Sequence, residues 1–122
     1  MNTLVWIVSG LLALAFLAAG LGKIVQDRSA LRERGMAYVD DFAPRSLQGI
    51  GVVEVLGAIG LVLPWALDVA PVLTPLAAAG LTITMIAAVA VHVRRGERKE
   101  IVPPAVLGLL ALFVAVVRFG QL

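Results

Sequence analysis

Four long runs of apolar residues, separated by more polar connectors, organise the chain. They cover about residues 3–22, 47–63, 72–93 and 103–119. As helices that rise 1.5 Å per residue, the first and third runs can cross a hydrocarbon core of about 30 Å. The second and fourth, near 17 residues each, lie at the lower limit for a span. The pattern predicts one all-α domain over residues 1–122, an integral membrane four-helix bundle.

Prolines stand at the boundaries of these runs. Pro64 follows the second run and predicts its end, whereas Pro71 and Pro75 suit the start of the third. The dipeptide Pro103-Pro104 is predicted to open the fourth helix. Proline fits there because the first helical turn leaves its amide nitrogens without intrahelical partners anyway.

Composition favours lipid over water as the surrounding medium. The chain is 61% hydrophobic and 15% charged, against about 45–50% and about 25% in an ordinary soluble domain. A soluble domain of this size buries only about two-thirds of its unfolded surface, so the surplus apolar side chains would face water. The first run also exceeds the apolar core of a signal peptide, and no Lys or Arg precedes it. We therefore expect it to be retained as a membrane span.

Basic residues are concentrated in two connectors that four spans would place on one side of the membrane. They are Lys23, Arg28, Arg32, Arg34, Arg45, Arg94, Arg95, Arg98 and Lys99, with Arg118 at the opposite side. Cytoplasmic loops of membrane proteins carry an excess of Lys and Arg. We expect a plasma-membrane protein with both termini extracytoplasmic. The formal charge of +2 thus reflects topology, and we expect no nucleic-acid partner.

The connector between the first two spans has a helical pattern of its own. Leu31, Gly35, Tyr38 and Phe42 recur at steps of four, three and four, with charged residues between them. Such spacing is typical of a short amphipathic helix lying in the membrane interface. An ordinary solvated connector is the alternative.

Glu54 is an acidic residue inside the second run. Seven residues past Leu47, it lies about 10 Å into the membrane, where an ionised carboxylate costs at least about 2.5–3.5 kcal/mol. Its helical neighbours Gly51, Gly57 and Ala58 are small, as close helix contact in a membrane requires. We expect Glu54 to face the bundle interior, either in a functional site or as a structural lock.

Three further residues complete the predicted ligand-binding set with Glu54. Lys23 ends the first span and His92 ends the third, so both are predicted to form an ionisable cluster with the acid. Thr84 belongs to a small, polar face of the third run, made of Gly80, Thr84, Ala88 and His92. The alternatives are snorkelling for Lys23 and helix capping for His92.

Several chemistries lack their residues. The chain has no Cys and one His, which excludes a disulfide framework, thiolate chemistry and bis-histidine haem ligation. It also has no glycine-rich phosphate loop and no HExxH motif. We expect no metal site, no catalytic residue and no resident cofactor, which makes catalysis by this chain alone doubtful.

Three segments resemble the DoxX-like family of small bacterial membrane proteins. Residues 18–23 read AAGLGK, residues 53–61 read VEVLGAIGL, and residues 90–97 read AVHVRRGE. The resemblance covers nearly the whole chain and implies a four-helix bundle in the plasma membrane. Named members of this family include a small subunit of a thiosulfate:quinone oxidoreductase and membrane partners of oxidoreductase complexes, and a vertebrate chaperone of nicotinic receptors is a distant relative. Members with thiol chemistry use groups that this chain lacks.

These observations favour a non-catalytic membrane subunit or binding protein. We expect a cleft around Glu54 that accepts a quinone, a lipid or a membrane partner. A quinone-coupled oxidoreductase subunit, which would need a redox partner, and a proton-coupled small-molecule transporter are the alternatives. Small-residue stripes on several helices also predict self-association, as a homodimer.

Overall fold

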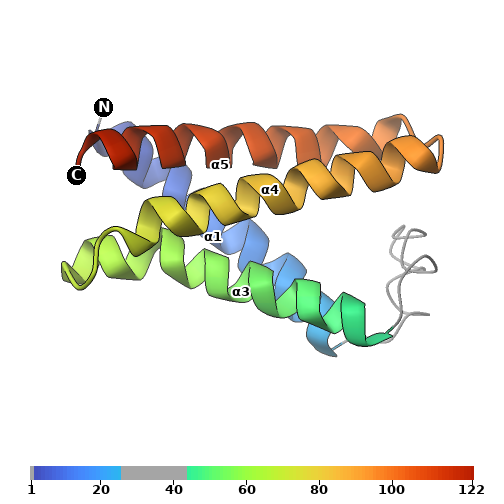
Figure 1. Cartoon of the computed structure of the whole chain (residues 1–122), viewed down its shortest axis with the longest axis horizontal. Coiled ribbons are helices and arrows are strands. Elements are labelled where there is room, and N and C mark those ends of the chain that lie inside the picture. Colours follow the sequence, from blue (N-terminus) through green and yellow to red (C-terminus); the bar gives the residue numbers. More distant parts are fainter. Residues whose placement is uncertain (1, 26–43) are drawn as a thin grey trace.

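The structure is a computed structural model, and it describes residues 2–25 and 44–122 (Figure 1). Within these ranges the chain is all-α, as predicted. Its elements are α1 (Asn2–Val25), α3 (Pro44–Leu67), α4 (Leu73–Arg94), a 3₁₀ turn η2 (Lys99–Ile101) and α5 (Val102–Gly120). Both termini lie at one end of the bundle, here called the terminal end (Figure 1). The opposite end, where α1 and α4 finish, carries Lys23 and Arg94 and is called the basic end.

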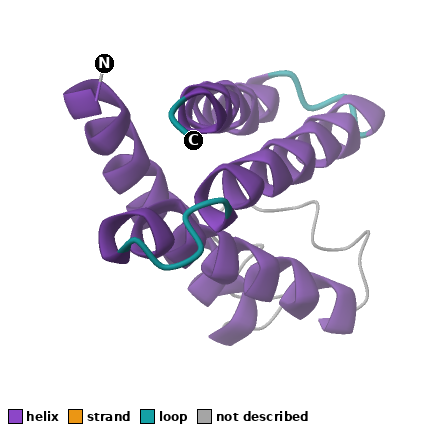
Figure 2. Ribbon diagram, turned by 60° about the vertical axis from the view of Figure 1, so that its left-hand side comes forward, coloured by secondary structure: helices purple, strands orange, loops and turns teal. Residues whose placement is uncertain are grey.

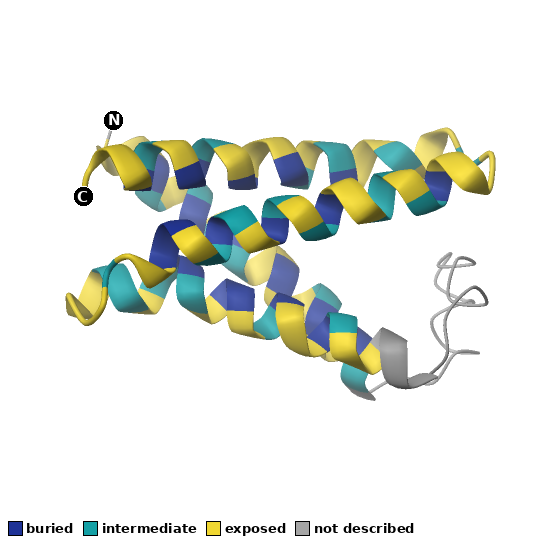
Figure 3. Ribbon diagram, in the orientation of Figure 1, coloured by how far each residue is buried: buried dark blue, intermediate teal, exposed yellow. Residues whose placement is uncertain are grey.

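All four helices are long and apolar enough to cross a membrane, which confirms the predicted spans. Exposed positions recur along the whole length of the helices (Figure 3), and many of them hold large apolar residues. On α1, for example, Leu4, Ile7, Leu11 and Leu14 are exposed and recur every three or four residues. An apolar surface of this extent requires lipid around it. The chain is a multi-pass membrane protein.

The helices form two pairs that join through α3 and α4. α1 packs along α3, and α4 packs along α5. α3 also contacts α4 extensively, whereas the contact between α1 and α5 is smaller. α1 starts near α5 at the terminal end and finishes beside the start of α3 at the basic end (Figures 1 and 2). This arrangement places the second and third spans at the centre of the packing.

The buried core contains many small and medium-sized side chains. Its apolar members are Val5, Leu12, Phe16, Ala58, Leu61, Ala78, Leu81, Met85, Ala111, Val114 and Ala115. Polar and charged side chains are buried with them: Ser9, Lys23, Glu54, Thr74, His92 and Arg118. Since a polar group in hydrocarbon is costly without a partner, these six residues are the candidates for a functional site.

Gly20 and Gly51 allow α1 and α3 to approach closely. A Cβ atom added to either glycine would lie 2.6 Å from the backbone carbonyl oxygen of the other. Small residues at helix contacts in membranes serve this purpose, because they let two backbones meet. Lys23 and Glu54 each lie three residues after one of these glycines, and the close crossing brings their side chains within reach of one another.

Three boundaries differ from the predicted ones by more than one residue. α1 continues to Val25, past its predicted end at residue 22. α3 begins at Pro44, and it continues through Pro64 to Leu67. Proline removes one hydrogen bond from a helix, but a membrane helix can continue past it when its neighbours support the chain. α4 and α5 match their predicted spans to within one residue at each end. The predicted amphipathic helix with Leu31, Gly35, Tyr38 and Phe42 lies outside the described residues and stays a prediction.

Candidate functional site

Lys23 and Glu54 form an ion pair inside the membrane-spanning part of the bundle. Lys23 Nζ donates to Glu54 Oε1 across 2.6 Å. The two side chains are 8% and 2% exposed, so water contributes little to their solvation. The pair links α1 to α3 next to the Gly20–Gly51 crossing. The structure therefore provides the partner that a carboxylate at this depth requires.

His92 pairs with Glu97 in the turn after α4. His92 Nδ1 lies 2.9 Å from Glu97 Oε1, and Arg95 Nε donates to the same oxygen across 3.2 Å. The Glu97 amide donates to the His92 carbonyl and the Gly96 amide to that of Val93, with Gly96 at φ +71°. This is a Schellman end, for which glycine is the favoured residue. Residues 92–97 thus cap α4, and Gly96 is the sequence feature that could have indicated it.

Thr84 makes a local hydrogen bond within α4. Its Oγ1 donates to the Gly80 carbonyl oxygen across 2.9 Å. Bonds of this kind satisfy a hydroxyl group inside a membrane helix without a ligand. The role of Thr84 in ligand binding stays a prediction.

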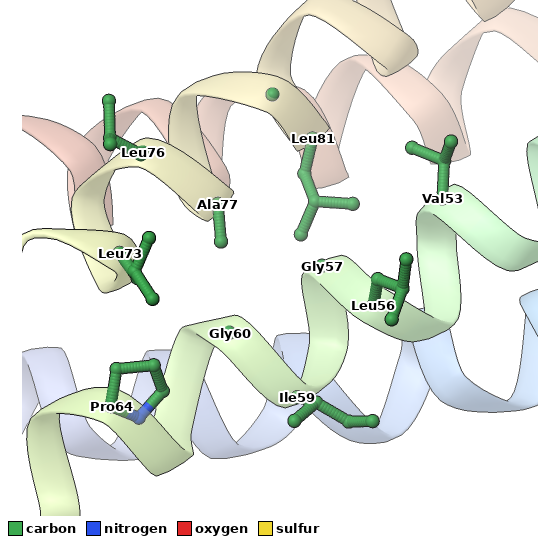
Figure 4. A pocket seen from close by; sticks show the side chains of 11 residues that line it. Val53, Leu56, Gly57, Ile59, Gly60, Pro64, Leu73, Leu76, Ala77 and Leu81 are labelled. Atoms are coloured by element: carbon green, nitrogen blue, oxygen red, sulfur yellow. The ribbon is translucent and has the colours of Figure 1, made fainter. Parts of the chain in front are cut away.

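An apolar groove runs along the outer side of the contact between α3 and α4 (Figure 4). Its volume is about 510 Å³, within the usual range of about 300–1,000 Å³ for small-molecule sites. It is lined by Val53, Leu56, Gly57, Ile59, Gly60, Pro64, Leu73, Leu76, Ala77, Gly80 and Leu81. None of these side chains carries a polar group, so the groove offers hydrocarbon contacts along its whole length.

Three glycines shape this groove. A Cβ added to Gly57 would lie 2.6 Å from Leu81 Cδ2, and one added to Gly60 would lie 2.7 Å from Ala77 Cβ. These two glycines therefore let α3 approach α4. At Gly80 an added Cβ would meet nothing within 4 Å. The missing side chain of Gly80 leaves open space in the groove itself.

Neighbours of Glu54 in α3 line the groove, but Glu54 itself does not. Val53 and Leu56 line the groove, while Glu54 faces α1 and pairs with Lys23. His92 and Thr84 are likewise absent from the lining. The structure thus brings Lys23 and Glu54 together, gives His92 a partner in Glu97, and opens the groove on another face of α3.

Arg118 has a more elaborate environment than the sequence indicated. It is fully buried at the terminal end of α5. Its Cζ atom lies 4.7 Å from the centroid of the Trp6 ring and 4.3 Å from that of Trp65. Nη1 donates to Gln121 Oε1 across 2.8 Å. The sequence placed Trp6, Trp65 and Arg118 near the same side of the membrane, which was the available signal for this cluster. Their contact with one another depends on the packing of α1, α3 and α5.

Comparison with known proteins addresses the identity of the chain. A family model described as the DoxX-like family matches residues 7–114, which is most of the sequence. The chain belongs to the DoxX-like family. Searches of curated proteins and of solved structures gave no match. In this DoxX-like chain, the first two resembling segments meet at the Lys23–Glu54 pair, and the third forms the cap of α4.

Proposed function

We propose that this DoxX-like chain is a non-catalytic membrane subunit or binding protein whose α3–α4 groove holds the hydrocarbon tail of a lipid or quinone. The observation that carries the proposal is the groove, whose side chains are all apolar, which has open space at Gly80, and whose lining includes the exposed Leu56 and Leu76. A tail in a recess contacts protein atoms on several sides and gains dispersion energy that a convex helix surface cannot supply.

The length of the groove favours one tail from one leaflet. From Val53 to Pro64 the lining extends over about 16 Å of α3. That is about half of a hydrocarbon core of about 30 Å. Pro64 and Leu73 form the part nearest the terminal end, so the head group of the ligand would lie toward that end. By the positive-inside prediction, the tail belongs to the extracytoplasmic leaflet.

The Lys23–Glu54 pair supports the groove indirectly in this proposal. It fixes α1 against one face of α3, while Val53 and Leu56 line the groove on another. A buried pair that orders two helices is a positioning element, since it does not touch the ligand. A second copy of the chain is the competing occupant, because small residues such as Gly80 also suit a helix contact.

A leucine at Gly80 tests the proposal directly. Gly80→Leu fills the groove without meeting other atoms near the Cβ position, so the bundle should remain folded. The leucine side chain would take the space in which several methylene groups of the tail contact the groove. We expect retention of a tail-bearing molecule to fall roughly tenfold, equivalent to about 1.4 kcal/mol. Native mass spectrometry after gentle extraction measures that retention.

Gly10→Leu is the matched control. An added Cβ at Gly10 also meets nothing within 4 Å, but Gly10 lies on α1, away from the groove. It should leave retention unchanged. Equal retention in both variants would contradict the proposal. Loss of a dimer in Gly80→Leu alone, with no bound tail in the original protein, would assign the groove to a second copy.

A further inference from the structure

Arg118 has two buried nitrogen atoms without a hydrogen-bond partner among the described residues. They are Nε and Nη2, while Nη1 is bound to Gln121. Buried donors of a charged group are costly to leave unpaired, because their full desolvation penalty remains. The surroundings supply two indole rings, which attract the cation but accept no such in-plane hydrogen bonds. Nε and Nη2 therefore have no acceptor within the part of the chain that the structure describes.

The positions of Nε and Nη2 determine which kind of acceptor would suit them. Nε and Nη2 are neighbours on one edge of the planar guanidinium, and their N–H bonds on that edge are nearly parallel. This fork matches two oxygens of one carboxylate or phosphate group. A single carbonyl oxygen would satisfy it less completely. The two unpaired donors on this edge thus fit an anion with two oxygens in suitable positions.

Two further buried polar atoms lie in the parts of α1 and α4 that are nearer the terminal end. Ser9 Oγ on α1 and Thr74 Oγ1 on α4 are also buried without a partner among the described residues. A hollow of about 330 Å³ is lined by Trp65, Asp68, Pro71, Gln121 and Leu122. Arg118 itself is buried and does not line this hollow, but Trp65 and Gln121, which contact it, do.

We propose that Arg118 binds the carboxylate or phosphate group of an anionic ligand at the terminal end of the bundle. Tryptophans near the ends of spans mark the membrane interface, where lipid head groups supply such anions. Trp6 and Trp65 place Arg118 at that depth. The proposal goes beyond the α3–α4 groove, because it rests on a charged site that the groove lining does not include.

Asp68 is the competing acceptor within the chain. It lies in the connector between α3 and α4, its side chain is exposed, and its backbone is in the left-handed region at φ +51°. Its carboxylate makes no ion pair with Arg118 in the structure, although both residues are described. An external anion is favoured for this reason, and Asp68→Asn is included in the test.

The test compares ligands that differ in the oxyanion. Delipidated protein in neutral detergent is titrated with phosphatidylglycerol, oleate, dioleoylglycerol and inorganic phosphate, and binding is measured by native mass spectrometry. We expect phosphatidylglycerol or oleate to bind about tenfold to a hundredfold more tightly than dioleoylglycerol, which lacks the anion. Binding of phosphate alone would identify a free anion as the source, whereas binding of the lipids alone would identify a head group. Either result supports the site.

Variants separate Arg118 from general charge effects. Arg118→Lys keeps the charge but loses the fork, so the preference for the anion should disappear. Arg94→Lys makes the same change on an exposed arginine at the basic end and should keep the preference. Gly10→Leu, on α1 and outside the groove lining, should keep it too.

Three results would overturn the proposal. The first is an absence of anion preference in the unmodified protein, which needs no variant to fold. The second is an undiminished preference in a folded Arg118→Lys protein. The third is an equal loss of stability in Asp68→Asn, in Arg118→Lys and in the variant that combines them. Such non-additive losses would identify Asp68 as the acceptor.

Discussion

Glu54 shows how far a single residue can be interpreted from sequence. Its depth in the second span and its small neighbours predicted an inward-facing acid that needs a partner. Lys23 and His92 were the two candidate partners for Glu54. Lys23 is the partner because α1 and α3 cross at Gly20 and Gly51, and no local sequence pattern specifies that crossing. Long-range contacts between helices were therefore the part that sequence could not determine.

His92 and Arg118 differ in how much of their surroundings the sequence can predict. The His92–Glu97 cap is local, and Gly96 is a signal in the sequence that could have indicated a helix end of that type. The surroundings of Arg118 combine residues from α1, α3 and α5, so an arginine near a helix end was equally consistent with snorkelling. Local motifs were predictable, whereas convergent sites were not.

Removing one partner of the Lys23–Glu54 pair should destabilise the bundle strongly. Glu54→Leu leaves a buried ammonium group without its carboxylate, a change that costs about 3–5 kcal/mol. The double variant Lys23→Met/Glu54→Leu removes both charges and should recover most of that loss. Unfolding in mixed micelles measures the free energy, with Glu100→Gln, an exposed acid, as the control expected to stay within about 0.5 kcal/mol.

The double variant also separates two roles of Glu54. If the pair only positions α3, the double variant should keep a tail bound in the groove. A double variant as unstable as Glu54→Leu would contradict the positioning role. A stable double variant that has lost the ligand would instead favour the prediction that Glu54 and Lys23 take part in binding.

At the scale of the elements, hydrophobic runs and prolines predicted four helices and most of their ends. α4 and α5 start and stop within one residue of the predicted positions. Pro64 was predicted to end the second helix, yet α3 continues to Leu67, because a proline alone does not determine where a supported membrane helix stops. The α3–α4 groove was not predicted, since it depends on which face of α3 meets α4.

The contact between α1 and α3 should depend on Gly51. Gly51→Ala places a Cβ atom 2.6 Å from the Gly20 carbonyl oxygen, so the two backbones must separate. We expect a loss of about 1–3 kcal/mol in unfolding free energy, the usual cost of overpacking. Gly49→Ala in the same helix, where an added Cβ meets nothing within 4 Å, is the control and should be neutral. An equally stable Gly51→Ala protein would show that the helices do not meet at this crossing.

At the scale of the whole molecule, the bundle combines a lipid-facing apolar surface with two specialised regions, one on that surface and one buried. One is the α3–α4 groove, and the other is Arg118 at the terminal end. The Lys23–Glu54 pair joins α1 to the helix that forms one wall of the groove. The side of the membrane that each end faces and the oligomeric state stay predictions, and the first of them determines which leaflet would supply the proposed tail.

The most direct test of the groove is to find where a lipid tail contacts the protein in a bilayer. A phospholipid or quinone analogue with a photoactivatable diazirine in its tail is incorporated into liposomes, and cross-linked peptides are identified by mass spectrometry. Leu56 in the groove and Leu11 on α1 are equally accessible, at 62% and 64% exposure, so exposure alone predicts equal labelling. A tail held in the groove predicts labelling concentrated at Val53, Leu56 and Leu76. Labelling spread evenly over Leu56, Leu11 and Leu14 would contradict a specific tail site.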